Sequence, residues 1–362
     1  MIVFLLEHAT NKNSEFHVGE ELLPNATTSD DAAFPYASPL MESPVAAEIF
    51  ESAPQGTPPP RIWSALVVGI MSVPVGICLQ LLTLLALIFI GFGVPTLDNL
   101  PAIQDWVVSF IDTDPALAVL IVPGQGVLLA AAYLAAKFSP RPFSERLALR
   151  SGRQPIWTWP VFAVATPVIG IVSSSLLSLV MDESENMKSM QKYFLTKDSS
   201  FMPTVFLMVA VLPGFCEEVL FRGYVQSRLL KRLPAAAAIA ISTLLFSAAH
   251  LDPKHVLAVI PLGAWLGIVA WRTGTIWPSI FGHMLNNALA VWITRQSGGD
   301  EMDVEFSAQL LGVYALCGAA LIVAIYALVR FGGEPTPAVS VLVTPTASPS
   351  DAAKSTAGSN NS

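Results

Sequence analysis

Two adjacent carboxylates at the end of an apolar run are the residues of this sequence best suited to chemistry. Glu217 and Glu218 follow the run 201–212, and acids in such a setting are costly, rare and usually functional. Arg222 lies four residues after Glu218, so on a helix the two side chains share a face and form an ion pair. Glu217 projects about 100° away, with no partner on its own helix face. The spacing predicts a structural ion pair and a free carboxylate, Glu217, that takes a proton from water.

Histidines and an asparagine follow the acidic pair at spacings that fit neighbouring helices. His250 ends the segment that begins at Phe246, and His283 stands four residues before Asn287, one helical turn away on the same face. His255 lies close by in the sequence. A lone histidine on an apolar helix is more often a packing residue than a ligand. Two histidines, an asparagine and a free carboxylate together favour a site that activates water.

The composition places the elements that carry these residues in a lipid bilayer. Hydrophobic residues make up 53% of the 362-residue chain and charged residues 13%, against about 25% charged residues in soluble domains. Apolar runs of membrane-spanning length recur through residues 62–329. We therefore expect an all-α, polytopic bundle of transmembrane helices. No basic cluster indicates a nucleic-acid partner.

The apolar runs predict eight spans between two tails. The acidic tail 1–60 holds nine acids and one base, which accounts for the whole net charge of −8, and we expect it to be disordered. We expect the same of the tail 332–362, which is rich in Pro, Thr, Ser and Ala. The body is 61–331, with the candidate site at about 200–290. The predicted spans are 62–94, 116–138, 157–181, 201–230, 235–250, 255–271, 276–294 and 308–331.

The basic residues of the loops predict the orientation of these spans. Twelve Lys and Arg residues fall on one side of the predicted bundle and five on the other. The basic side faces the cytoplasm in membrane proteins, so we expect a cell-membrane protein with both termini in the cytoplasm. Glu218 and His250 are each sixteen residues from Pro234, so antiparallel helices would place them at one level. The turn 251–254 would then be submerged and would line a cavity that opens to the cytoplasm.

These motifs resemble those of a known family of membrane peptidases. The stretch 217–223, the pair Phe246 and His250, and the pair His283 and Asn287 resemble the three motifs of the CAAX-protease and bacteriocin-processing family, also called ABI. The resemblance covers about residues 200–290. It implies an intramembrane peptidase in which a buried water attacks a peptide carbonyl of a membrane-associated substrate, prenylated in some members.

Two mechanisms fit these residues, and the first needs no metal. Glu217 and His250 polarise a water molecule, while His283 and Asn287 stabilise the oxyanion that forms on the substrate. Asn286 is the less favoured partner because it lies off the four-residue step.

The second mechanism uses zinc. Glu217, His250 and His283 would then hold the ion and leave one position open for water, as in other catalytic zinc sites. Glu218 would act as the base or pair with Arg222. The zinc motif HExxH is absent, so the sequence does not require a metal, and both mechanisms remain open.

Two readings without peptide hydrolysis also remain. The polar residues could bind the helix of a partner, a peptide or a small ligand, which would make the protein a membrane scaffold or a bacteriocin-immunity factor. Spans that contain Pro and Gly also occur in transporters, but no matching interruptions in two halves of the chain are seen.

Overall fold

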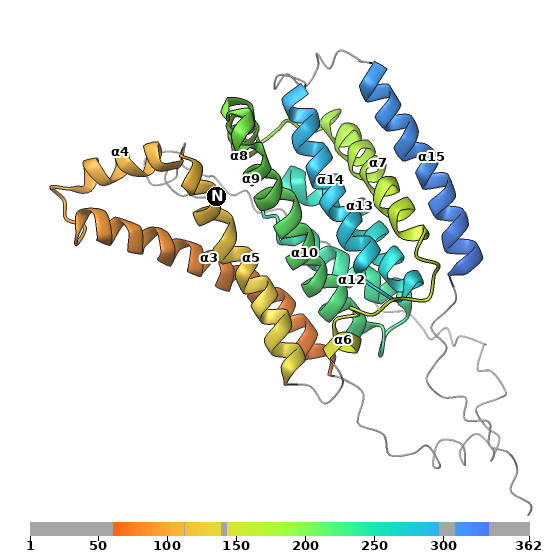
Figure 1. The fold of residues 1–362 in the computed structure, drawn as a ribbon. Helices are drawn as coiled ribbons and strands as arrows, with labels where there is room; N and C mark the ends of the chain where they lie inside the picture. Colours follow the sequence, from red (N-terminus) through yellow and green to blue (C-terminus); the bar gives the residue numbers. More distant parts are fainter. Residues whose placement is uncertain (1–60, 112, 139–142, 297–307, 333–362) are drawn as a thin grey trace, which may run out of the picture.

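The computed structural model describes residues 61–111, 113–138, 143–296 and 308–332 (Figure 1). Within these ranges the chain is helical and forms no strand. The expected tail 1–60 and all but the first residue of the tail 332–362 lie outside the described residues. The prediction of an all-α helical bundle is confirmed.

Each of the eight predicted spans is a helix. They are α3 (Ile62–Phe92), α5 (Asp114–Lys137), α7 (Thr158–Ser178), a continuous series over Ser199–Leu229, α12 (Ala235–Ala248), α13 (Pro253–Thr273), α14 (Trp277–Gln296) and α15 (Ala308–Phe331).

Six of these eight helices are long and apolar enough to cross a membrane. The two exceptions are α12, a shorter apolar helix, and α14. The 14 residues of α12 extend only about 21 Å at the helical rise of 1.5 Å per residue. α14 carries His283, Asn286 and Asn287, which lower its hydropathy. Both helices carry residues of the predicted site. The shorter length of α12 and the lower hydropathy of α14 therefore occur in helices that carry these polar groups.

Three further helices occupy segments that the sequence presented as loops. They are α4 (Leu100–Ile111), α6 (Phe143–Arg146) and α8 (Glu185–Thr196). α8 begins at an N-cap, because the Ser184 side chain accepts a hydrogen bond from the Met187 N–H at 3.3 Å. α4 and the adjoining end of α3 extend away from the other helices (Figure 1).

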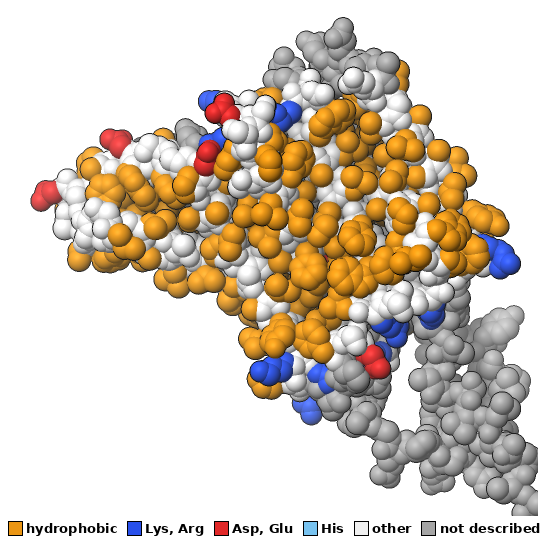
Figure 2. Space-filling model, viewed as in Figure 1, with side chains coloured by type: hydrophobic (Ala, Val, Ile, Leu, Met, Phe, Trp, Pro, Cys, Tyr) orange, Lys and Arg blue, Asp and Glu red, His pale blue; other side chains and the backbone are white. Residues whose placement is uncertain are grey.

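The surface fits a molecule surrounded by lipid. Figure 2 shows apolar side chains over most of the visible face, with the charged ones gathered toward the ends of the helices. The exposed apolar residues include Leu82 and Ile90 of α3 and Ile322 and Val329 of α15. Because water is absent from a bilayer core, apolar side chains are stable there.

The helix that carries the two carboxylates lies at the centre of the bundle. It runs from η2 (Ser199–Phe201) through α9 (Met202–Val205), η3 (Phe206–Val211), α10 (Leu212–Glu218) and η4 (Val219–Gln226) to α11 (Ser227–Leu229). Every residue of η4 is buried. The largest core cluster combines buried residues of α10, η4, α12, α13 and α14.

Glycines of α13 let this central helix approach closely. Arg222 donates to the Gly263 carbonyl at 2.9 Å, and Gln226, one turn later, donates to the Gly267 carbonyl at 2.8 Å. A Cβ at Gly263 would lie 3.3 Å from Arg222 Nη2, and one at Gly267 would lie 2.8 Å from Gln226 Oε1. The small residues four apart thus form a helix contact typical of membrane proteins.

A second close approach joins α10 to α14. A Cβ at Gly214 would lie 3.0 Å from the backbone nitrogen and 3.2 Å from the Cα of Met284, the residue after His283. Backbone atoms cannot move aside as a flexible side chain can. Gly214 therefore sets the separation between the helix of Glu217 and Glu218 and the helix of His283.

We predict that Gly214→Ala destabilises the protein. Overpacking costs about 1–3 kcal/mol, which exceeds the gain of up to about 1 kcal/mol from replacing a helical glycine by alanine. Thermal unfolding in detergent should show a Tm several degrees below that of wild type. The matched control is Gly318→Ala in α15, where a Cβ meets nothing within 4 Å, and its Tm should stay the same or rise. Equal Tm values for the two variants would contradict the close approach.

Candidate active site

The helix that carries the carboxylates is irregular on both sides of them. Glu217 and Glu218 are the last two residues of α10, and the flanking segments η3 and η4 are π-helical. Wide turns of this kind are rare and frequently lie at functional sites. Pro213 adds a further irregularity, because it has no N–H to give to the Val209 carbonyl four residues earlier.

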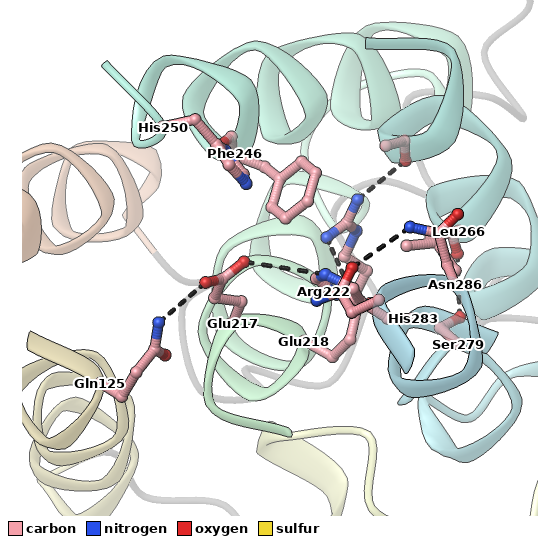
Figure 3. Close-up of polar contacts among 12 residues, drawn as sticks. Gln125, Glu217, Glu218, Arg222, Phe246, His250, Leu266, Ser279, His283 and Asn286 are labelled. Atoms are coloured by element: carbon pink, nitrogen blue, oxygen red, sulfur yellow. Dashed lines mark hydrogen bonds and ion pairs between the residues drawn. The ribbon is translucent and has the colours of Figure 1, made fainter. Parts of the chain in front are cut away.

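Glu218 lies at the centre of the polar network (Figure 3). Its Oε1 is 2.7 Å from Arg222 Nη1 and 3.0 Å from His283 Nδ1, and its side chain is fully buried. The ion pair that the four-residue spacing predicted is present. The Arg222 guanidinium also lies over the Phe246 ring, 4.2 Å from its centroid. Arg222 is therefore fixed by a carboxylate, the Gly263 carbonyl and an aromatic face.

This network sets the orientation of His283. The ionised Glu218 can only accept hydrogen bonds, so we assign the proton of the neutral imidazole to Nδ1. Nε2 then carries a lone pair, and it lies 4.0 Å from Oε2 of Glu217. Glu218 thus holds a histidine whose second nitrogen faces the other carboxylate.

Glu217 has a partner from a distant part of the chain. Its Oε1 accepts a hydrogen bond at 2.9 Å from Gln125 Nε2 on α5. No partner was expected on the helix face of Glu217 itself, and the contact comes instead from 92 residues earlier in the chain. The sequence contained one signal, since Gln125 is a polar residue inside an apolar span. The Glu217 side chain keeps 13% of its surface exposed, so it remains accessible to a small molecule.

His250 lies beside the same aromatic ring as Arg222 and His283. Its Nδ1 is 3.1 Å from the Phe246 carbonyl, so we assign the Nδ1 proton to that bond and leave Nε2 as the acceptor. The Phe246 ring meets both imidazoles edge to face, with centroids 5.1 Å from His250 and 5.6 Å from His283. His255 stacks on His250 at 4.6 Å, a contact that the sequence analysis did not identify.

Asn287 makes its contacts away from the two carboxylates. Its Nδ2 donates to the Val209 carbonyl at 3.3 Å, and its Oδ1 accepts from Asn286 Nδ2 at 3.2 Å. Val209 is the residue whose carbonyl lacks an α-helical donor because of Pro213. Asn287 therefore supplies a hydrogen bond to this carbonyl of the central helix. Only one of its two amide N–H groups is used in doing so.

The turn between α12 and α13 packs against the connection between α7 and α8. Asp252 caps α13 by accepting the His255 N–H at 2.9 Å, and Lys254 Nζ lies 3.7 Å from Glu183. Burial alone would raise the pKa of Asp252, but hydrogen bonds from the Ser184 side chain and the His255 N–H hold that pKa below its usual value. The polar groups of the turn are thus satisfied by the connection between α7 and α8, which follows the end of α7 opposite the basic loop.

The three expected zinc ligands do not form a metal site in this conformation. Among the described residues, no three His, Cys, Asp or Glu side chains come together to hold a metal. His283 uses Nδ1 on Glu218 and His250 uses Nδ1 on Phe246. Their Nε2 atoms and Glu217 remain as donors, but these groups are not gathered into a metal site among the described residues. Nδ1 hydrogen bonds to a carboxylate and a backbone carbonyl are of the kind that orients zinc-binding histidines, so the zinc mechanism stays a prediction.

The fold and site together define an all-α membrane protein with a buried carboxylate–histidine centre. Comparison with known families then identifies the core, because residues 199–289 match the family model described as "Type II CAAX prenyl endopeptidase Rce1-like". This match contains all three motifs. This match supports the resemblance seen in the sequence over residues 199–289.

A curated protein is similar to a quarter of the chain. The Bacillus subtilis (strain 168) protein named "Putative membrane peptidase YdiL" is 28% identical over 90 residues, which is 25% of this chain and 37% of the relative. No solved structure matches the chain. The family model leaves α3, α5 and α7 uncovered, so Gln125 lies outside the family region.

We predict that Glu218→Gln destabilises the protein more than loss of an exposed charge does. It leaves the buried Arg222 without its carboxylate, and breaking a buried pair costs about 3–5 kcal/mol. The double variant Glu218→Gln/Arg222→Gln should recover part of the lost Tm. The control is Glu185→Gln, which removes an exposed ion pair with Lys188 and should change Tm little. A Tm for Glu218→Gln that equals that of wild type would contradict a structural ion pair.

Proposed function

We propose that this protein is an intramembrane endopeptidase that hydrolyses a peptide bond of a membrane-associated protein or peptide. The observation that carries the proposal is the chain of contacts from Arg222 through Glu218 and His283 to Glu217. It keeps one carboxylate permanently paired and leaves the other partly exposed beside an imidazole nitrogen. That division of roles suits general base catalysis.

The geometry supports direct activation of water by Glu217. Oε2 of Glu217 and Nε2 of His283 are 4.0 Å apart, and a water molecule about 2.8 Å from each would bridge them off the line that joins them. Glu217 takes one proton, while the lone pair of His283 orients the other. The water oxygen bonds to the peptide carbon, the carbon–nitrogen bond breaks, and Glu217 returns its proton to the leaving nitrogen.

The second amide N–H of Asn287 is the donor proposed for the oxyanion of the intermediate, because Val209 does not occupy it. His250 gives its Nδ1 proton to the Phe246 carbonyl, so its Nε2 stays an acceptor and does not stabilise the oxyanion. Figure 3 shows His250 beside the Phe246 ring. A prenylated substrate is one member of the substrate class, and an unmodified membrane peptide is another.

We predict that Glu217→Gln abolishes cleavage and leaves the protein folded. Glutamine keeps the size of the side chain but removes the base, and general base catalysis alone is worth about 10²–10⁴ in rate. New peptide termini in the membrane fraction should be quantified by mass spectrometry in cells that express wild type or Glu217→Gln. A set of cut peptides that is the same in cells with wild type and in cells with Glu217→Gln would contradict the proposal. Equal capture of an uncut partner by both proteins, with no cleavage by either, would support a scaffold or immunity factor.

A chelator separates the metal-free mechanism from the zinc alternative. Purified wild-type protein should retain its rate after treatment with 1,10-phenanthroline, because the proposed water is held by Glu217 and His283 alone. Loss of activity that added zinc restores would show that His250, His283 and Glu217 rearrange into a zinc site.

The proposed orientation places the basic loops in the cytoplasm of a cell-membrane protein. Ser151 and Ser199 are both exposed and lie at opposite ends of the body. A membrane-impermeant maleimide should label Ser199→Cys on intact cells and Ser151→Cys only after permeabilisation, with wild type as the background for the native cysteines. The reverse pattern would invert the orientation.

A further inference from the structure

Gln125 is the one residue outside the family region that forms a hydrogen bond to Glu217 among the described contacts. Its Nε2 donates to Oε1 of Glu217 at 2.9 Å, and Figure 3 shows its amide pointing from α5 toward that carboxylate. Family resemblance could not have assigned it, because the match begins at residue 199. Through this contact, α5 contributes a side chain to the site.

The second atom of the same amide indicates that Gln125 does more than pack. Its Oε1 is buried and accepts no hydrogen bond from the protein. A buried acceptor left unsatisfied costs about 1–3 kcal/mol, whereas an apolar side chain at this place in the span would avoid that cost. The amide thus combines one donor used on Glu217 with one acceptor beside it that faces no protein donor.

Two contacts between α3 and α5 fix the direction of Gln125. A Cβ at Gly76 would lie 3.4 Å from the Cα of Gly124, so the two backbones meet closely at the residue before Gln125. Gln80 of α3 donates from Nε2 to the Leu120 carbonyl one turn earlier. Because Gly124 faces α3, the next side chain projects about 100° around the helix, toward α10.

We propose that Gln125 is a positioning residue of the peptidase. This proposal rests on the proposed function of Glu217. Its N–H fixes the rotamer of Glu217 so that Oε2 faces the hydrolytic water and His283. Its Oε1 remains a buried acceptor on the same amide, without a protein donor. Helices outside the family core thereby complete the site.

The test compares Gln125→Met with wild type, because methionine has similar length and no amide. The probe is a library of internally quenched apolar peptides in phosphatidylcholine and phosphatidylglycerol vesicles, followed by the library member that wild type cuts. Loss of a hydrogen bond to a charged group should lower kcat about 10- to 100-fold. KM should stay within about twofold, because Gln125 acts on the base rather than on substrate binding.

The matched control is Gln226→Met on the central helix. Gln226 also donates one hydrogen bond, at 2.8 Å, to the Gly267 carbonyl, and it is buried. This variant should lower Tm and leave kcat per folded molecule unchanged. If Gln125→Met does not fold, Gln125→Asn keeps the amide but withdraws it by one methylene and should show the same loss of kcat.

The outcomes separate this inference from the proposed function. No cleavage by wild type, or equal cleavage by Glu217→Gln, would contradict the proposed peptidase function itself. Cleavage by wild type with kcat of Gln125→Met within twofold of it would overturn the positioning role alone. A raised KM with unchanged kcat would also overturn it, because Gln125 would then bind substrate rather than position the base.

Discussion

The buried guanidinium of Arg222 is the constraint on which the site depends. A charge in the centre of a helical bundle is costly unless it is paired. Glu218 pairs with Nη1, the Gly263 carbonyl accepts from Nη2, and the guanidinium lies over the Phe246 ring, while Nε is buried without a hydrogen-bond partner. Because the same carboxylate oxygen also holds His283 Nδ1, the arrangement that stabilises Arg222 also fixes the His283 imidazole.

Irregular helix geometry and glycines at close helix contacts bring these groups together. Pro213 and the π-helical segments η3 and η4 interrupt the central helix around the two carboxylates. Gly214 permits contact with α14, and Gly263 leaves room for the guanidinium. The interrupted carbonyl of Val209 is satisfied by Asn287. The polar site and the unusual helix geometry are therefore parts of one structural solution.

Local spacing was sufficient to predict the parts of the site that lie within one helix or one turn. The four-residue step from Glu218 to Arg222 predicted their ion pair, and the apolar runs predicted all eight long helices. Contacts across the sequence could not be predicted in this way. Gln125 reaches Glu217 through the packing of α5, and the Asp252 turn is covered by the connection between α7 and α8. Neither follows from spacing, because each depends on which helices become neighbours.

In the function that we propose, the division between a paired Glu218 and a reactive Glu217 makes water, and not the protein, the nucleophile. A single turnover in H₂¹⁸O, with enzyme in excess over the cleaved peptide, tests this claim most directly by mass spectrometry. Direct attack by water predicts one ¹⁸O atom in the new C-terminal carboxylate of the product and none in the peptide that contains Glu217. Attack by Glu217 followed by hydrolysis at the Glu217 carbonyl would leave ¹⁸O on Glu217 and ¹⁶O in the product, and that result would contradict the assignment of Glu217 as a general base.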